Sequence, residues 1–466
     1  MGYYMGKIKE FFTDRSFFKT VLKIALPMVI QNGITNLVNV LDNVMVGSIS
    51  SEATSGVAII NQFMFVFYLL TFGAVSAAGI FTAQYHGKGD NENVRATFRI
   101  KIMICLAASV TGILLFALFK DFFINMFLTD TGAGIDPELT FTLGAEYLFV
   151  MLFGIVPYSL SQAYASTLRE TKRTVLPLIA GLSAVIINLF LNYALIFGKL
   201  GFPALGVAGA ALATVISRYA EFLILVICTH TTSKKSPFIT GAYKSLRVPG
   251  LLIRKVVRMG FPLILNEGLW ALAITLRNQC YSTRGLHAVT AISISSTFSN
   301  LFSAVYLSLG AATMVIIGNM LGAGQIEQAK KTNKKLLAFS VLCSVVLGII
   351  MASLSGVFPK FYNTTEQAAA LTVFMLIVRA ATMPFSSYTN VAYFTLRSGG
   401  KVFITVLFDS AFMWAVVMPL SFILSRFTNI DIHPMFIICE GTEFLKMMLG
   451  YILLKRGTWA VSLVDR

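Results

Sequence analysis

Long apolar runs alternate with short polar connections along almost the whole chain. A run of about 20 apolar residues is long enough for a helix to cross the hydrocarbon core of a bilayer, so each run predicts one transmembrane helix. We place twelve helices, at residues 17–46, 53–82, 94–119, 138–165, 173–198, 205–230, 252–282, 287–318, 333–358, 367–395, 402–427 and 434–455. The pattern therefore indicates an all-α polytopic membrane protein.

Composition agrees with this prediction, and the placement of charge adds an orientation. The 466 residues are 56% hydrophobic and 12% charged, far from the balance of soluble domains. The net charge of +16 comes from Lys and Arg concentrated on alternate connections, and the remaining connections carry only Lys120, Lys199, Arg284, Lys360 and Arg426. Because cytoplasmic connections hold the positive excess, we expect a plasma-membrane protein with both termini cytoplasmic and no nucleic-acid partner.

An internal repeat divides the chain into two halves. The sequence VLKIALPMVIQNG (Val21–Gly33) aligns with VVRMGFPLILNEG (Val256–Gly268) at an offset of 235, which also aligns Gly87 with Gly322. An offset of six helices keeps the orientation in the membrane, so the two lobes are related by a pseudo-two-fold axis along the membrane normal. We predict an N-lobe at residues 1–230, a cytoplasmic linker at 231–251 and a C-lobe at 252–466.

Several short motifs, in this order along the chain, resemble the bacterial type of the multidrug and toxic compound extrusion (MATE) family. They are ALP (Ala25–Pro27), NVLDNVMVG (Asn39–Gly47), GKG (Gly87–Gly89), ASTLRETKR (Ala165–Arg173), NLFLNYALIFG (Asn188–Gly198) and GVAGAALATVISR (Gly206–Arg218). The resemblance implies a secondary active antiporter that works by alternating access. It would export organic, often cationic compounds in exchange for inward H⁺ or Na⁺, without a cofactor.

Asp42 is the first candidate site residue, because it is the only charged residue between Lys23 and Glu52. An acid within an apolar helix is costly and by default marks a function. Desolvation in a membrane cavity favours the protonated form of a carboxyl group, so such an acid can bind and release a proton or hold a cation. The resemblance places Asp42 in the N-lobe cavity, and the alternative is a cap near the outer water.

Polar residues of the fifth and sixth helices are expected beside Asp42. Asn188 and Asn192 are four residues apart and share one helix face. Thr214 resembles a hydroxyl of the same cluster in the family. An amide can hydrogen-bond a protonated carboxyl but cannot titrate, so Asp42 would carry the proton of this lobe. The alternative is that Asn and Thr only join neighbouring helices.

The C-lobe leaves the coupling ion open. Glu267 lies in the seventh helix, where sodium-coupled relatives also have a glutamate, but about one turn away from the expected position. Those relatives add an acid in the tenth helix, where this chain has Arg379 and Asn390. Asp409 or Arg379 could pair with Glu267, as an ion site or as a structural ion pair. Together the two lobes favour H⁺ over Na⁺, and Na⁺ is the only metal ion considered.

Comparison of the repeats indicates that the lobes differ in charge, since Arg277 takes the position of Asp42. Helical spacing also predicts self-neutralising pairs between Arg218 and Glu221 and within the set Glu440, Glu443 and Lys446.

The remaining candidates line the expected cleft or act as hinges. Substrate contacts are predicted, beside Asp42, at Tyr158, Trp270, Tyr306, Met314, Arg379, Tyr388 and Asn390, where aromatic faces can stack on a flat cation. Packing is the alternative role for each of them. Pro27 and Pro262 remove backbone hydrogen bonds at equivalent positions, which predicts hinges; the first helix would bend near Pro27 when Asp42 is protonated.

Two other functions compete with drug antiport. A flippase for a lipid-linked or other amphipathic metabolite would need several basic residues in its cleft, and Arg277 and Arg379 are the main candidates. An intramembrane enzyme would need a nucleophile and base or paired metal ligands, and no HExxH motif or GxSxG motif near a His is found. The five cysteines are scattered singly, which argues against disulfides and zinc. We therefore expect a transporter, not an enzyme, acting as a monomer.

Overall fold

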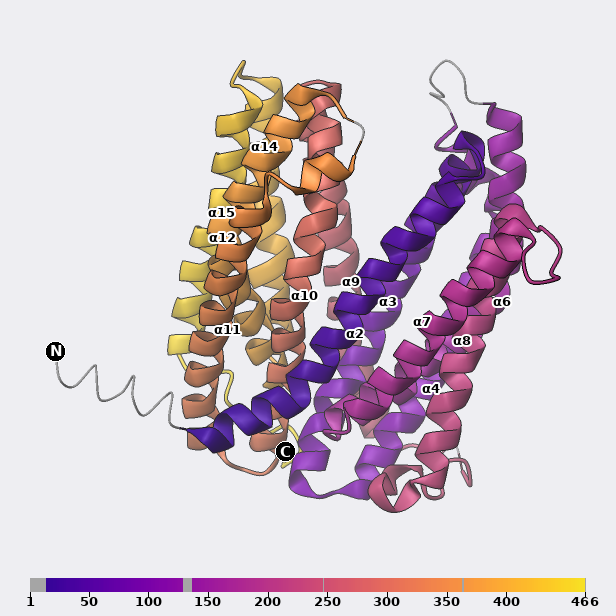
Figure 1. The fold of residues 1–466 in the computed structure, drawn as a ribbon. Helices are drawn as coiled ribbons and strands as arrows, with labels where there is room; N and C mark the ends of the chain where they lie inside the picture. The colour runs from indigo at the N-terminus through magenta and orange to yellow at the C-terminus, as the bar shows by residue number, and fades with distance from the viewer. Residues whose placement is uncertain (1–13, 129–135, 246, 363, 466) are drawn as a thin grey trace. The chain divides into compact units, whose positions relative to one another are not determined.

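The computed structural model describes residues 14–128, 136–245, 247–362 and 364–465. Its helices are α2 (Arg15–Gly47), α3 (Ser51–Lys88), α4 (Asn91–Leu118), α5 (Lys120–Asn125), α6 (Pro137–Glu170), α7 (Val175–Phe197), α8 (Gly206–Thr231), α9 (Gly250–Ser282), α10 (Leu286–Gly322), α11 (Ile326–Leu354), α12 (Glu366–Ser398), α13 (Val402–Val406), α14 (Met418–Arg426) and α15 (Ile432–Lys455) (Figure 1). Single turns lie at η1 (Ser233–Lys235), η2 (Pro237–Ile239) and η3 (Phe358–Phe361), and two π turns at η4 (Leu407–Ala411) and η5 (Met413–Val417).

Helices lie at all twelve predicted positions, with ends that shift by a few residues. Among the described residues, eleven helical segments are long and apolar enough to cross a membrane, and Val402–Arg426 counts as one of them. The remaining helix, α15, lies where the twelfth was predicted but carries Glu440, Glu443 and Lys446. The largest shift is at α11, which starts at Ile326 instead of 333 because its Lys-rich first turns are helical although they are polar.

Side-chain caps fix several helix starts. Asp90 accepts a hydrogen bond from the backbone N–H of Asn93 at the start of α4, and Asp136 does the same for the first turn of α6. Thr365 caps α12 and Asp431 caps α15. Such caps satisfy backbone donors that a helix leaves without partners, so the polar residues between apolar runs set where the helices begin.

The residues group into two compact units. One, which we call the C-unit, comprises the chain up to Gly33, Ala83–Gly89 and the chain from Leu265 onward; the other, the N-unit, comprises Ile34–Thr82 and Asp90–Ile264. The unit boundary therefore passes through α2, α3 and α9. These units are defined by contacts, whereas the lobes at 1–230 and 252–466 are defined by the repeat and stay a prediction.

Each unit is a bundle held together by close helix packing. In the C-unit, α12 packs against α10, α11 and α15, and in the N-unit α8 packs against α6 and α7 (Figure 1). Small residues allow the approach: a Cβ on Gly209 of α8 would lie 2.6 Å from the carbonyl oxygen of Leu195 on α7, and one on Gly348 of α11 would lie 2.7 Å from that of Ala380 on α12. Glycine is thus required where membrane helices touch backbone to backbone.

Gly322→Ala is expected to destabilise the C-unit. The added Cβ would lie 1.8 Å from the carbonyl oxygen of Gln84, a backbone atom that has no rotamer to move to. Overpacking of this kind costs about 1–3 kcal/mol, which a lower thermal midpoint in detergent would report. Gly441→Ala in α15 is the control, since its Cβ meets open space and the midpoint should stay unchanged or rise. Equal midpoints for both variants would contradict the close approach.

Candidate ion-coupling site

Three predicted polar residues of the N-unit lie around the carboxylate of a fourth, Asp42. Asp42 on α2 is half-buried, and Asn192 Nδ2 of α7 donates to its Oδ1 at 2.7 Å. The Asn188 amide nitrogen reaches Asp42 Oδ1 at 3.1 Å and Oδ2 at 3.2 Å in one orientation of the amide, and Thr214 Oγ1 at 3.3 Å in the other. The structure therefore brings together Asp42, Asn188, Asn192 and Thr214, as the sequence predicts.

Local sequence places the two amides. Asn188 and Asn192 stack on one face of α7 because four residues make about one helical turn, and Asn192 Nδ2 also lies 3.2 Å from Asn188 Oδ1. The helix ends six residues later at Gly198, whose φ of +64° suits glycine. The close approach at Gly209 then holds α8 near enough for Thr214 to contact Asn188.

The hydrogen-bond partners of Asp42 suit a proton better than a metal ion. The neighbouring groups are the amides of Asn188 and Asn192, which donate N–H groups to the carboxylate and can each supply at most one oxygen to a cation. Asn192 Oδ1 is buried and accepts no hydrogen bond from the described residues. An amide that turns around presents an acceptor to a protonated carboxyl, so the same side chains can satisfy both protonation states of Asp42.

The N-unit, which contains Asp42, also contains an ion-paired arginine and two neighbouring tyrosine rings. Arg218 donates to Glu221 at 3.1 Å, which confirms the predicted helical pair. Its guanidinium also lies 5.3 Å from the ring centroid of Tyr158, and that ring lies 4.1 Å from the ring of Tyr68. Tyr158 is therefore the predicted substrate contact that shares a unit with Asp42.

Glu267 forms a buried ion pair within the C-unit. Its Oε1 accepts from Arg397 Nη1 at 3.2 Å and from the Tyr393 hydroxyl at 3.2 Å, and Arg397 Nη1 also donates to the Tyr393 hydroxyl at 2.8 Å. Arg397 is completely buried. Sequence analysis considered Asp409 or Arg379 as the partner of Glu267. The partner is Arg397 instead.

Asp409 is neutralised in a similar way. Lys446 Nζ donates to its Oδ1 at 2.7 Å, and Asn266 Nδ2 donates to its Oδ2 at 3.0 Å. Asp409 lies in the π turn η4, where Ser410 Oγ donates to Asn266 Oδ1 at 2.7 Å. A π turn is a frequent feature of functional positions in helices. The predicted pairing of Lys446 with Glu440 or Glu443 is wrong, because Lys446 pairs with Asp409.

The two halves have exchanged acid and base at equivalent positions. Aligning YAEFL (Tyr219–Leu223) with GTEFL (Gly441–Leu445) sets Arg218 against Glu440, just as the first alignment sets Asp42 against Arg277. Arg277 Nη1 lies 3.7 Å from Glu440 Oε1. The C-unit thus carries the cation on the first helix of its half and the acid on the last, the reverse of the N-unit.

The other predicted contact residues belong to the C-unit. Arg379 donates to Ser296 Oγ at 3.1 Å and lies 5.6 Å from the ring centroid of Phe436. Trp270 and Tyr306 pack against hydrophobic clusters, Met314 is buried and Tyr388 is half-buried. Asn390 Oδ1 is buried without a hydrogen-bond partner among the described residues. Trp270, Tyr306 and Met314 therefore make packing contacts, and a role in binding substrate stays a prediction for them, as for Asn390.

No metal centre is found in the described ranges, where no group of three or more His, Cys, Asp or Glu side chains could hold a metal ion. All five cysteines are free. Sequence reasoning missed Tyr393, Arg397 and Asn266, and it gave Lys446 the wrong partner. The available signals were the spacing of four between Tyr393 and Arg397 and the position of Asn266 directly before Glu267.

Comparison with known families decides where the chain belongs. The family model MatE matches residues 27–194 and 269–423, well over half of the chain. The chain belongs to the MatE family. This confirms the resemblance to multidrug and toxic compound extrusion transporters.

Named relatives and solved structures agree with this membership. The MatE chain is 24% identical to "Probable multidrug resistance protein NorM" of Thermotoga maritima over 95% of this chain and 93% of the relative. It is 26% identical to a protein of the same name from Bacillus cereus, over 83% and 84% of the two chains.

The solved structures establish the fold. A Vibrio cholerae MATE transporter, VcmN, matches with a TM-score of 0.86 at 15% identity, covering 97% of this chain and 99% of that one. The outward-facing conformation of a multidrug resistance MATE family transporter matches with a TM-score of 0.85 at 16% identity, covering 95% and 96%. The predicted all-α fold class is confirmed, and twelve helices in two lobes fit the MATE fold.

Proposed function

We propose that this MatE protein is a secondary active antiporter that exports organic cations or amphipathic compounds in exchange for H⁺ bound at Asp42. One observation carries the proposal. Asp42 is held by amides, and among the described residues no cation lies within ion-pair distance of it, whereas Glu267 and Asp409 each pair with a buried cation of the same unit. A carboxylate that forms no direct ion pair within the described residues can bind a proton or a cation from outside.

Competition at one carboxylate would couple the two fluxes. An ionised Asp42 attracts a cationic substrate, and protonation removes the charge that attracts it. Proton and substrate then exclude each other, which is the requirement for exchange instead of co-transport. The amides Asn188 and Asn192 can satisfy either form, so the site need not unfold to change state.

H⁺ is favoured over Na⁺ as the coupling ion because of the ligand chemistry. A bound alkali cation requires several oxygen ligands by analogy with other hard cations, and the amides of Asn188 and Asn192 can supply at most one oxygen each beside Asp42. In the C-unit, Arg397 and Lys446 occupy the positions beside Glu267 and Asp409 that a sodium ion would need. The charges of the C-unit therefore support a structural role for its two acids.

Further features support a plasma-membrane drug exporter. Curated relatives bear the name multidrug resistance protein, and family members carry small organic compounds across the lipid bilayer. We propose that both termini are cytoplasmic, that the protein works as a monomer, and that it needs no cofactor and is not an enzyme. The flippase alternative has less support, because Arg277 already lies beside Glu440.

Reconstitution in liposomes tests the proposal. An imposed pH gradient should drive movement of an ethidium-like cation by the purified protein, and a sodium gradient of equal size should not. Transport driven by the sodium gradient alone would assign the coupling to Na⁺. Absence of transport under both gradients would count against cation antiport.

Pro27→Ala is expected to slow proton-driven transport. Pro27 lies inside α2, and Pro262 lies inside α9, close to where the boundary between the two units crosses each helix. Proline removes one backbone hydrogen bond, so each helix bends there at less cost. The measurement is the initial rate of cation movement under a fixed pH gradient. The control is Pro157→Ala in α6, a helix that the boundary does not cross. Equal transport rates for the two variants would contradict a hinge at Pro27.

A further inference from the structure

The C-terminal tail, residues 457–465, folds back onto the helices of the C-unit. Trp459 is buried, and its indole N–H donates to the carbonyl oxygen of Leu454 at 3.2 Å. The carbonyl oxygen of Trp459 lies only 1.7 Å from where a Cβ on Gly399 would be. The tail thus sits directly on the end of α12, in a place that only glycine leaves open.

One buried side chain of α3 holds the backbone of the tail. Gln84 is fully buried, its Nε2 donates to the carbonyl oxygens of Ser398 at 2.9 Å and Val461 at 3.4 Å, and its Oε1 accepts from the N–H of Leu463 at 2.7 Å. These partners are backbone atoms, so Gln84 binds a tail conformation and not particular tail side chains. A single amide therefore joins α3, the end of α12 and the tail.

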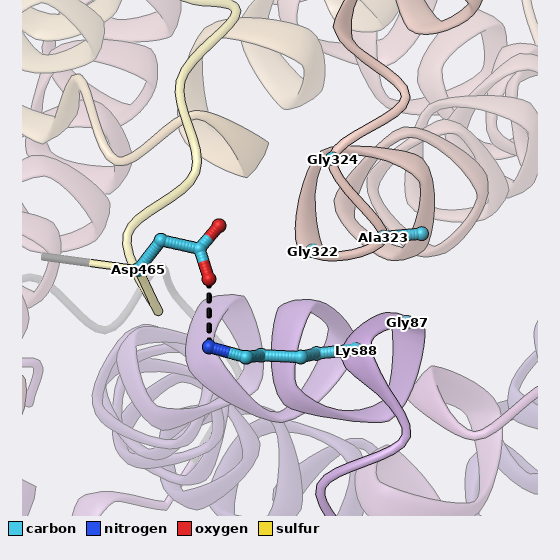
Figure 2. A pocket seen from close by; sticks show the side chains of 6 residues that line it. All are labelled: Gly87, Lys88, Gly322, Ala323, Gly324 and Asp465. Carbon is cyan, nitrogen blue, oxygen red and sulfur yellow. Dashed lines mark hydrogen bonds and ion pairs between the residues drawn. The ribbon is translucent and has the colours of Figure 1, made fainter.

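An exposed ion pair lies at the edge of the contact between α3 and the tail. Lys88 Nζ, in the last turn of α3, donates to Asp465 Oδ1 at 2.7 Å and to the carbonyl oxygen of Val464 at 3.2 Å (Figure 2). The hydrogen bond from Lys88, aided by one from Ser462, holds the pKa of Asp465 below its ordinary value, so the pair stays charged at neutral pH. Lys88 and Asp465 border an open depression of about 300 Å³ that Gly87, Gly322, Ala323 and Gly324 also line (Figure 2).

Helices α3 and α10 cross at this point with their backbones in contact. A Cβ on Gly87 would lie 2.0 Å from the carbonyl oxygen of Asn319, while one on Gly322 would lie 1.8 Å from that of Gln84. His86 Nδ1 and Asn319 Oδ1 are 2.7 Å apart. The repeat aligns Gly87 with Gly322 and Gln84 with Asn319, so the crossing is pseudo-symmetric. The tail adds hydrogen bonds to Gln84 and Lys88 of α3.

We propose that the C-terminal tail is a latch that holds residues 83–89 against α10 and α12 and must release for the transport cycle to proceed. Residues 83–89 belong to the C-unit, but α3 continues without a break into Ser51–Thr82 of the N-unit. A movement that carries residues 83–89 along with the N-unit part of α3 would break the hydrogen bonds of Gln84. In the proposed orientation this end is cytoplasmic, so the latch lies on the cytoplasmic side.

Hydrogen exchange of the full-length protein in lipid nanodiscs tests the latch without a substrate. The peptide covering residues 457–465 should exchange slowly in the native protein. Gln84→Ala should speed its exchange about tenfold, since buried hydrogen bonds are lost. Asp465→Asn should speed it about two- to fivefold, as for an exposed ion pair. Asp14→Asn, which removes the acid of the partly exposed Lys335–Asp14 ion pair, should have no effect on this peptide.

Unchanged exchange in Asp465→Asn and Gln84→Ala would overturn the latch. If Gln84→Ala does not fold, Asp465→Asn still decides the question, because its side chain is half-exposed and not part of the core.

A chemical cross-link tests whether the latch must open. Lys88→Cys and Asp465→Cys are combined in a protein whose five native cysteines are alanine, and a bis-maleimide joins them. Cross-linking should stop cation movement in liposomes, whereas each single cysteine treated with the reagent should remain active. A cross-linked protein that transports at the full rate would show that release is unnecessary and would overturn the proposal. Failure of the uncross-linked protein to transport would count against the antiport function, and the exchange experiment would still judge the latch.

Discussion

Asp42→Asn protein in liposomes is expected to lose transport driven by a pH gradient, down to the rate of empty liposomes. The amide has nearly the shape of the carboxyl group, but it neither binds a proton in this pH range nor attracts a cation. Asn188, Asn192 and Thr214 stay in place to fill the site, so folding should be preserved. The measurement is the initial rate of movement of an ethidium-like cation, with thermal unfolding in detergent as the check on folding.

Glu267→Gln is the matched control for Asp42→Asn. It also replaces one carboxylate by an amide, but in a site where Arg397 already neutralises the acid. Correctly folded Glu267→Gln protein should keep transport driven by the pH gradient. The opposite outcome, in which Glu267→Gln abolishes transport and Asp42→Asn keeps it, would move the proton site to the C-unit and refute our assignment.

The helices were predictable because the bilayer imposes their length. Every backbone polar group in lipid must be satisfied within its own segment, so a long apolar run has few alternatives to a helix. The start of α11 was missed for the complementary reason. Its first turns, from Ile326 through the Lys-rich stretch, extend past the apolar run, and hydropathy carries no signal there.

The Asp42 cluster was predictable because much of its geometry is local. Asn188 and Asn192 share a helix face by spacing alone. The pairing of this face with Asp42, 150 residues away in sequence, came from the family resemblance and not from any pattern within the chain.

The ion pairs of the C-unit were beyond sequence reasoning because their partners are distant and the charge rule misplaced one of them. Arg397 lies 130 residues from Glu267, near the end of α12, where a positive charge is expected to face the cytoplasm. Burial of its guanidinium depends on how α9 and α12 pack against each other, and the sequence of either helix alone does not predict that packing. The contact of Gln84 with the tail has the same origin, since it joins segments 377 and 379 residues apart.

Arg397→Met is expected to destabilise the protein by about 3–5 kcal/mol, because it leaves the carboxylate of Glu267 buried without its cation. Arg397 is completely buried, and its Nη1 also donates to Tyr393, so water cannot replace it without opening the bundle. The measurement is the free energy of unfolding by a graded denaturing detergent, with helicity as the signal. A loss below about 1 kcal/mol, the range of exposed ion pairs, would mean that the pair is solvated.

The double variant Glu267→Gln with Arg397→Met separates the ion pair from simple loss of packing. Removing both charges eliminates the unpaired carboxylate, so the double variant should be more stable than Arg397→Met alone. Additive losses would instead mean that Arg397 contributes by packing and through its other contacts. Recovery of stability together with retained proton-driven transport would mark Glu267 and Arg397 as a structural pair, which leaves Asp42 as the carboxylate available to the proton.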